Sequence, residues 1–132
     1  MDGQAQGVGT ADAVISILSK DPKVFLSLFA VTSVMAPLLE EVVFRGFLLA
    51  TLTKWMPAPT AALVSAGLFG AAHLTSRDFA QLTALGVVLG LTYVRTKNLA
   101  TPVLIHSFWN SGVLFLLEVL YLAGYDVSEL LK

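Results

Sequence analysis

Residues 24–53 read VFLSLFAVTSVMAPLLEEVVFRGFLLATLT, an apolar stretch whose only charged side chains are Glu40, Glu41 and Arg45. A helix of this length is about 45 Å long at ~1.5 Å per residue, so it exceeds the ~30 Å hydrocarbon core of a bilayer. Such a helix must tilt, bend or break. Pro37 is the expected place, because proline removes one backbone donor and clashes with the preceding turn. The stretch therefore predicts a long membrane helix that carries charge inside it.

Three further uncharged stretches follow, at residues 55–76, 79–94 and 98–117. Each is at or near the roughly 17 to 25 residues that a helix needs to cross a bilayer. Proline-rich or charged turns separate them. We therefore predict an all-α fold, a polytopic transmembrane helix bundle of about four hydrophobic helices. Glycines inside these stretches are typical of close helix contacts between small residues, at Gly67, Gly70, Gly86 and Gly90.

Polar segments flank the predicted bundle. Residues 1–23 form a polar lead-in, residues 24–125 the transmembrane domain and residues 126–132 a short polar tail. The lead-in contains no arginine and resembles neither a secretory signal nor a transit peptide. We therefore treat residues 24–125 as the part of the chain that carries the function.

Composition favours lipid as the solvent. The chain is 56% hydrophobic and 13% charged, against usual shares of roughly 45 to 50% and ~25%, and its mean hydropathy is +0.79. The net charge of −1 provides no basic surface, which excludes nucleic acid as a partner and leaves membrane lipid as the expected one. With no cysteine there is no disulfide and no thiolate metal site. We expect a multi-pass integral membrane protein, in a bacterial plasma membrane, a plastid or the endoplasmic reticulum.

Ionisable groups inside a membrane helix cost about 2.5 to 3.5 kcal/mol each, so each needs a partner or a function. Arg45 follows Glu41 by four residues, which places both on one helix face within reach of an ion pair. Glu40 is rotated by about 100° and has no partner within the helix. The alternative is a charged helix end that reaches water at the lipid interface.

Two more polar groups interrupt the later stretches. His73 lies near the end of the second, one turn after Phe69. His106 and Asn110 are four residues apart in the last one, which puts an imidazole and a carboxamide on one helix face. Taken singly, His73 is also typical of a hydrogen-bonded residue at the membrane interface. The His106 and Asn110 pair is equally typical of polar contacts that join helices.

Taken together, these groups favour a site. Three different helices each contribute a costly polar cluster, and that cost is most easily met if the clusters converge. A carboxylate, two imidazoles and a carboxamide around a wet cavity supply a base, a second proton carrier and neutral hydrogen-bond donors. These are the parts that water-driven acyl hydrolysis requires.

The clusters also resemble the motifs of a known family. EEVVFR at residues 40–45, FGAAH at residues 69–73 and HSFWN at residues 106–110 resemble the EExxxR, FxxxH and HxxxN motifs of the CAAX protease and bacteriocin-processing family, the type II CAAX prenyl endopeptidases. The resemblance implies that Glu41 and Arg45 hold the first helix in place. Family members usually carry further membrane helices before the first motif, so we expect this chain to be a fragment or an alternative product.

The same resemblance implies an activity, the cleavage of a peptide bond inside the membrane. The substrate would be a peptide or a prenylated protein, typically cut to release the last three residues after a prenylated cysteine. By motif, Glu40 with His73 would activate a water, and His106 with Asn110 would form the oxyanion hole. No metal or other cofactor is implied.

Three alternatives remain open on the sequence. Glu40, His73 and His106 could serve as the ligands of a zinc metalloprotease, although the chain has no HExxH motif. The polar cluster could instead be a structural clamp in a catalytically silent membrane scaffold or immunity protein. A proton relay or transporter has the right residue types but lacks an internal repeat.

Overall fold

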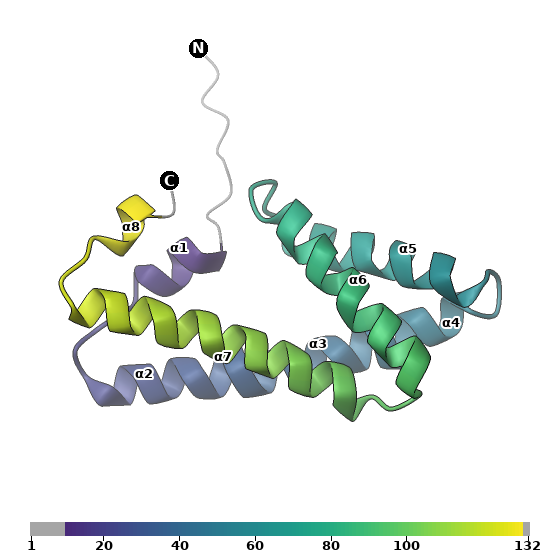
Figure 1. Ribbon diagram of the computed structural model, residues 1–132, viewed down its shortest axis with the longest axis horizontal. Coiled ribbons are helices and arrows are strands. Elements are labelled where there is room, and N and C mark those ends of the chain that lie inside the picture. The colour runs from purple at the N-terminus through teal and green to yellow at the C-terminus, as the bar shows by residue number, and fades with distance from the viewer. Residues whose placement is uncertain (1–9, 131–132) are drawn as a thin grey trace, which may run out of the picture.

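The computed structural model describes residues 10–130, which form helices joined by short turns (Figure 1). In chain order these are α1 (Thr10–Ile15), α2 (Pro22–Phe29), the π-helix η1 (Ala30–Met35), α3 (Ala36–Glu41), the π-helix η2 (Val42–Leu49), α4 (Ala50–Leu52), α5 (Ala58–Ala72), α6 (Phe79–Thr96), α7 (Ala100–Leu122) and α8 (Val127–Leu130). Within this part of the chain no strand occurs. The predicted all-α fold is confirmed.

The first membrane helix is continuous from Pro22 to Leu52, 31 residues that comprise α2, η1, α3, η2 and α4. It begins with Asp21 as its N-cap, whose carboxylate accepts a hydrogen bond from Lys23 N at 2.9 Å. Of the three outcomes expected at Pro37, a tilt, a bend or a break, the structure excludes the break. Instead the helix widens into η1 just before this proline. The wider π turn lets the helix continue past a residue that has no backbone N–H.

Three helices are long and apolar enough to cross a membrane, namely Pro22–Leu52, α6 and α7. The fourth predicted span, residues 55–76, yields only the 15-residue apolar helix α5. It starts after Pro57 and stops at Ala72, because Leu74 adopts a left-handed conformation with φ of 57°. About four hydrophobic helices are thus present, one of them shorter than a full span.

Helices α5 and α6 pack along small residues. A Cβ added to Gly86 would lie 3.0 Å from Ala66 Cα, and one added to Gly90 would lie 3.4 Å from Ala62 Cβ. A methyl group would be crowded at Gly86 and would just touch α5 at Gly90, as expected for a close helix contact. Gly67 differs, since nothing lies within 4 Å of a Cβ at that position. The predicted small-residue contact is therefore made by Gly86 and Gly90, and also by Gly70, where a Cβ would meet Thr83 and Phe79, but not by Gly67.

The helices are arranged around the first one. Helix α7 packs along η1 and α3, while α5 contacts η2 and pairs with α6 at the far end (Figure 1). The short helices α1 and α8 meet at the opposite end. There they join a core made of Leu18, Leu28, Leu114, Leu117 and Val127. A second core, made of Leu49, Ala61 and Ala62, fills the other end. The predicted site lies between these two cores.

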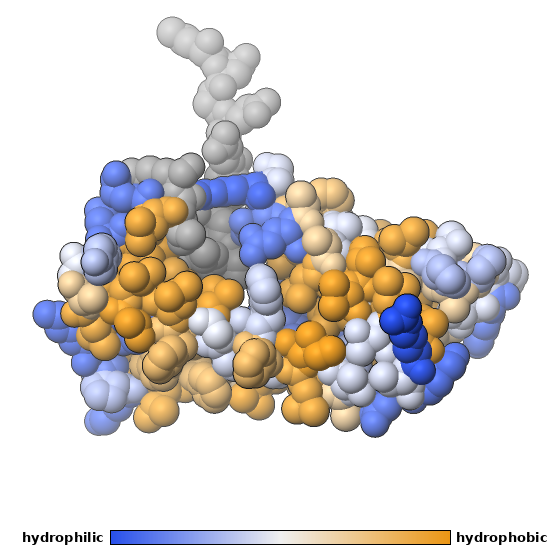
Figure 2. Space-filling view, viewed as in Figure 1, coloured by the Kyte–Doolittle hydropathy of each residue, from blue (hydrophilic) through white to orange (hydrophobic). Residues whose placement is uncertain are grey.

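Large apolar side chains cover much of the outer surface (Figure 2). Phe108 is 82% exposed, Phe47 70% and Leu26 63%. Isolated exposed apolar residues are ordinary in soluble proteins, but broad apolar surfaces are not. On helices of spanning length, this surface fits contact with lipid chains.

Candidate active site

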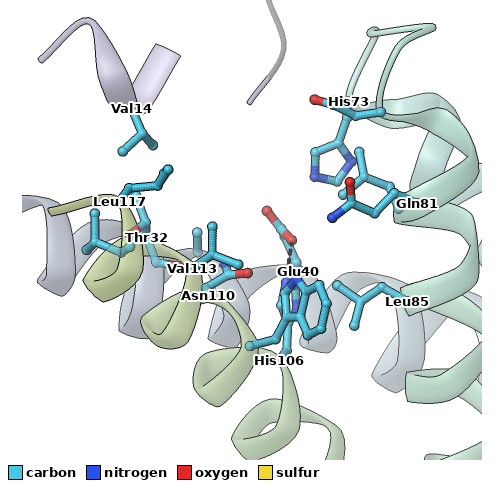
Figure 3. A pocket seen from close by; sticks show the side chains of 15 residues that line it. Val14, Thr32, Glu40, His73, Gln81, Leu85, His106, Asn110, Val113 and Leu117 are labelled. Carbon is cyan, nitrogen blue, oxygen red and sulfur yellow. Dashed lines mark hydrogen bonds and ion pairs between the residues drawn. The ribbon is translucent and has the colours of Figure 1, made fainter. Parts of the chain in front are cut away.

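A cavity of about 250 Å³ lies between α3, α7 and the start of α6. The four predicted catalytic residues, Glu40, His73, His106 and Asn110, all line it (Figure 3). Much of the remaining wall is apolar, from Val14, Leu82, Leu85, Val113, Leu114 and Leu117. A cavity of this size is far larger than one water molecule requires. Helices that are far apart in the sequence thus bring their polar side chains to one cavity.

The ion pair expected from the four-residue spacing lies beside this cavity. Arg45 Nη1 is 3.1 Å from Glu41 Oε1, and both side chains are fully buried. Arg45 Nη2 also donates to the carbonyl of Gly86 on α6, at 3.0 Å. The guanidinium carbon lies 4.6 Å from the centre of the Phe69 ring on α5. A buried ion pair needs such additional contacts to offset its loss of water, and Arg45 obtains them from two other helices.

The imidazole of His106 contacts both glutamates. Its Nδ1 lies 2.8 Å from Glu41 Oε1, and its Nε2 lies 3.6 Å from Glu40 Oε2. An ionised carboxylate can only accept a hydrogen bond, so Nδ1 carries a hydrogen and donates it to Glu41. That bond fixes the ring with Nε2 toward Glu40 and the cavity. Glu41 is therefore shared between Arg45 and His106, a contact between helices that the sequence did not reveal.

His73 is held in the same manner by a backbone group. It is the C-cap residue of α5, and its Nδ1 donates to the carbonyl of Phe69 at 2.8 Å. The other ring nitrogen is then left for the cavity, where His73 faces Glu40 (Figure 3). The Phe69 ring packs edge-on against both histidines, with centroids 4.9 Å from His73 and 5.7 Å from His106. Phe69 thus fixes both imidazoles from one side.

Asn110 is anchored through the π-helix. Its Nδ2 donates to the carbonyl of Thr32 at 2.8 Å. In an α turn the partner of that carbonyl would be the N–H of Ala36, and in a π turn it would be the N–H of residue 37, which is a proline. Ala36 N–H donates instead to Val31, five residues back, and proline has no N–H. The side chain of Asn110 therefore supplies the hydrogen bond that Pro37 cannot make.

Two site features were missed by reasoning from the sequence. Thr32 contributes only its backbone, and the only signal for it was a proline five residues later. Gln81 lies on the first turn of α6 and lines the cavity, but no motif or periodic pattern marks it. Sequence patterns identify side chains that are costly to bury, and an exposed glutamine carries no such cost.

The zinc alternative is not favoured by this geometry. Within residues 10–130, no group of three or more histidine, aspartate or glutamate side chains is placed so that it could hold a metal ion. Glu40, His73 and His106 face one cavity but do not form such a group. A metal with three protein ligands would require all three to reach one point at about 2 Å.

Comparison with known proteins gives a consistent result. Residues 22–112 match the family model described as type II CAAX prenyl endopeptidase Rce1-like. Curated relatives include the candidate membrane peptidase YdiL of Bacillus subtilis, 27% identical over 104 residues, and the membrane-embedded CAAX protease MroQ of Staphylococcus aureus, 34% identical over 87 residues. An uncharacterized 24.3 kDa protein of Escherichia coli is 33% identical over 94 residues.

These matches cover 79%, 61% and 64% of this chain, respectively. They cover only 41%, 35% and 41% of the relatives, so the chain spans well under half of their length. No solved structure matches. With three helices of spanning length and membrane proteins among its relatives, the chain is an integral membrane protein.

Proposed function

Because the chain belongs to the Rce1-like family of type II CAAX prenyl endopeptidases, we propose that it is an intramembrane endopeptidase in which Glu40 and His73 activate a water molecule. The observation that carries the proposal is that the four side chains to which the motifs assign catalysis line one cavity, namely Glu40, His73, His106 and Asn110. The family match, over residues 22–112, includes every one of these residues. Neither the scaffold nor the transport alternative is favoured by that membership.

Activation of water follows from the hydrogen bonds of the two side chains. His73 uses Nδ1 on the Phe69 carbonyl, so in the neutral ring Nε2 is an acceptor that faces the cavity. The Glu40 side chain is 30% exposed and its carboxylate also accepts. A water between them donates one hydrogen to each, which directs an oxygen lone pair toward the substrate carbonyl. As that oxygen bonds to the carbon, its proton passes to Glu40 and then to the leaving amine.

Stabilisation of the oxyanion falls to His106 and Asn110. His106 Nδ1 is committed to Glu41, so Nε2 can donate only when the ring carries both protons. In that form the charges of Glu40, Glu41, Arg45 and His106 sum to zero, which suits a site surrounded by lipid. Asn110 uses one hydrogen of Nδ2 on Thr32 and keeps the second for the oxyanion. Donors of this kind, held in place before the reaction, contribute strongly to acyl transfer.

The substrate we propose is a peptide or a prenylated protein that reaches the site from the lipid. The apolar part of the cavity wall suits an apolar side chain beside the scissile bond. One relative, MroQ, is named a CAAX protease, which supports testing prenylated and unprenylated peptides in parallel. Comparison of the two peptides measures whether cleavage requires the prenyl group.

The proposal is tested with the chain reconstituted in lipid nanodiscs and incubated with such peptides in ¹⁸O-labelled water. We expect mass spectrometry to find one ¹⁸O atom in the new carboxyl group of the product. Glu40→Gln should abolish cleavage with unchanged protein abundance, because the amide cannot accept the proton of the water. Glu129→Gln, an exposed acid on α8, is the matched control and should cleave normally. Full turnover by Glu40→Gln would refute the role of Glu40.

A further inference from the structure

Gln81 is a cavity residue that none of the three motifs includes. We propose that Gln81 binds the main chain of the substrate at a peptide group next to the scissile bond, on the side of Glu40 opposite to Asn110. This inference rests on the proposed endopeptidase function and adds a substrate-binding residue to it. Gln81 would not touch the reacting atoms, so its contribution would be to binding.

The position of Gln81 supports this role. It lies on the first turn of α6 and lines the cavity together with Glu40 and His73. In Figure 3 its carboxamide points toward the space in front of Glu40, between His73 and Leu85. Asn110 reaches the same space from the other wall (Figure 3). Two carboxamides thus approach the candidate base from opposite sides.

The two carboxamides differ in what they bind. Asn110 Nδ2 is held by the carbonyl of Thr32. Gln81, in contrast, has an exposed side chain with no hydrogen-bond partner among residues 10–130. A carboxamide presents an acceptor and a donor side by side, which complements the N–H and C=O of a peptide group. The hydrogen-bonding groups of Gln81 are therefore available to a ligand in the cavity.

The charge of the cavity decides between two ligand groups. Among residues 10–130, those that line it include the acids Glu40 and Asp78 but neither lysine nor arginine. Binding of a substrate carboxylate normally uses such cations, especially arginine. A neutral peptide group has no need of a cation and is not repelled by the two acids. The lining therefore favours an internal peptide group over the terminal carboxylate of a substrate as the ligand of Gln81.

The experiment uses the chain in nanodiscs and a peptide that it cleaves, in which each peptide N–H near the cut is replaced in turn by an ester oxygen. Gln81→Leu keeps the approximate size of the side chain but cannot form hydrogen bonds. We expect it to raise KM about 3- to 10-fold with little change in kcat, as the loss of one neutral hydrogen bond predicts. The ester that removes the N–H bound by Gln81 should raise the KM of the wild type by a similar factor. It should cause no further rise in the KM of Gln81→Leu.

Two variants make the result specific. Gln81→Glu keeps a hydrogen-bond acceptor but loses the donor. It replaces Gln81→Leu in the experiment if that variant does not accumulate. Ala80→Leu adds an exposed leucine to the same turn, at a position that does not line the cavity, and should leave KM unchanged. The inference would be overturned, and the proposed function left intact, if Gln81→Leu had the KM of the wild type. The same holds if every ester substrate raised KM by the same factor in Gln81→Leu as in the wild type. Absence of cleavage by the wild type would overturn the proposed function and this inference with it.

Discussion

His106 Nδ1 lies 2.8 Å from Glu41 Oε1, so one carboxylate oxygen accepts from both the imidazole and the guanidinium of Arg45. This contact connects a buried ion pair to the wall of the cavity. It gives Glu41 two functions, the neutralisation of Arg45 and the orientation of His106. Carboxylates that hold a histidine ring in one orientation recur in hydrolases, where their loss lowers the rate strongly.

The first prediction separates these two functions of Glu41. Arg45→Ala removes the guanidinium from the buried Glu41 carboxylate and leaves it only the contact with His106; loss of one partner of a buried ion pair costs about 3 to 5 kcal/mol in comparable cases. We expect lower abundance in the membrane fraction and lower activity. The double change of Glu41→Gln with Arg45→Met removes both charges and should restore part of the abundance. It should not restore activity, because the double variant also removes the Glu41 carboxylate that orients His106. Abundance comes from quantitative blotting, and activity from cleavage normalised to protein. Wild-type abundance of Arg45→Ala would contradict the structural role.

The second prediction concerns Pro37. Pro37→Ala supplies an N–H that can donate to the carbonyl of Thr32, in competition with Asn110. Removal of a proline from a helix interior also relieves a cost of about 3 kcal/mol. We therefore expect unchanged or higher abundance together with lower kcat, since Asn110 loses its anchor. Pro37→Ala combined with Asn110→Ala should be no slower than Asn110→Ala alone. If the two effects on kcat multiply, Pro37 does not act through Asn110.

The third prediction compares two glycines of the packed helix pair. A Cβ on Gly86 would lie 3.0 Å from Ala66 Cα and 3.2 Å from the Phe69 ring. Gly86→Ala should therefore force α5 and α6 apart and destabilise the chain by about 1 to 3 kcal/mol. Gly67→Ala meets nothing within 4 Å and should be neutral or stabilising by up to ~1 kcal/mol. Thermal unfolding of both variants in one detergent measures the difference, and equal stability would refute the packing argument.

The fourth prediction concerns the end of α6. Lys97 caps this helix in a left-handed conformation with φ of 54°, which is costly for a residue with a Cβ. Lys97→Gly should stabilise the chain by up to ~1 kcal/mol. Lys54→Gly is the control, because Lys54 is not among the residues with positive φ and gains only unfolded-state freedom from glycine. Both are compared by thermal unfolding. A lower stability for Lys97→Gly than for Lys54→Gly would argue against strain at this cap.

Much of the fold and the membership of the site could be predicted from the sequence. The rule that buried charge needs a partner was enough to pair Glu41 with Arg45, and the cost of polar groups in lipid was enough to predict a shared cavity. These inferences use only local spacing and composition. They require no knowledge of how one helix is rotated against another.

The contacts between helices could not be predicted in the same manner. Whether His106 faces Glu40, Glu41 or both depends on the rotation of α7 about its axis. The π-helical segments change the register of the first helix, so a regular 100° step does not describe it. The anchor of Asn110 is a backbone carbonyl, which no side-chain pattern reports. The length of α5 depends on a left-handed leucine, a conformation that sequence rules assign mainly to glycine and asparagine.

The π-helices η1 and η2 bracket the six-residue α-helix α3, which carries both glutamates. A π turn holds more residues than an α turn over a similar rise. The gain or loss of one residue in such a segment during evolution can then be absorbed by exchange between the two kinds of turn. In a uniform α-helix the same change would rotate every later side chain by about 100°. The first helix can therefore vary in length by insertion or deletion at η1 while its carboxylates keep facing the cavity.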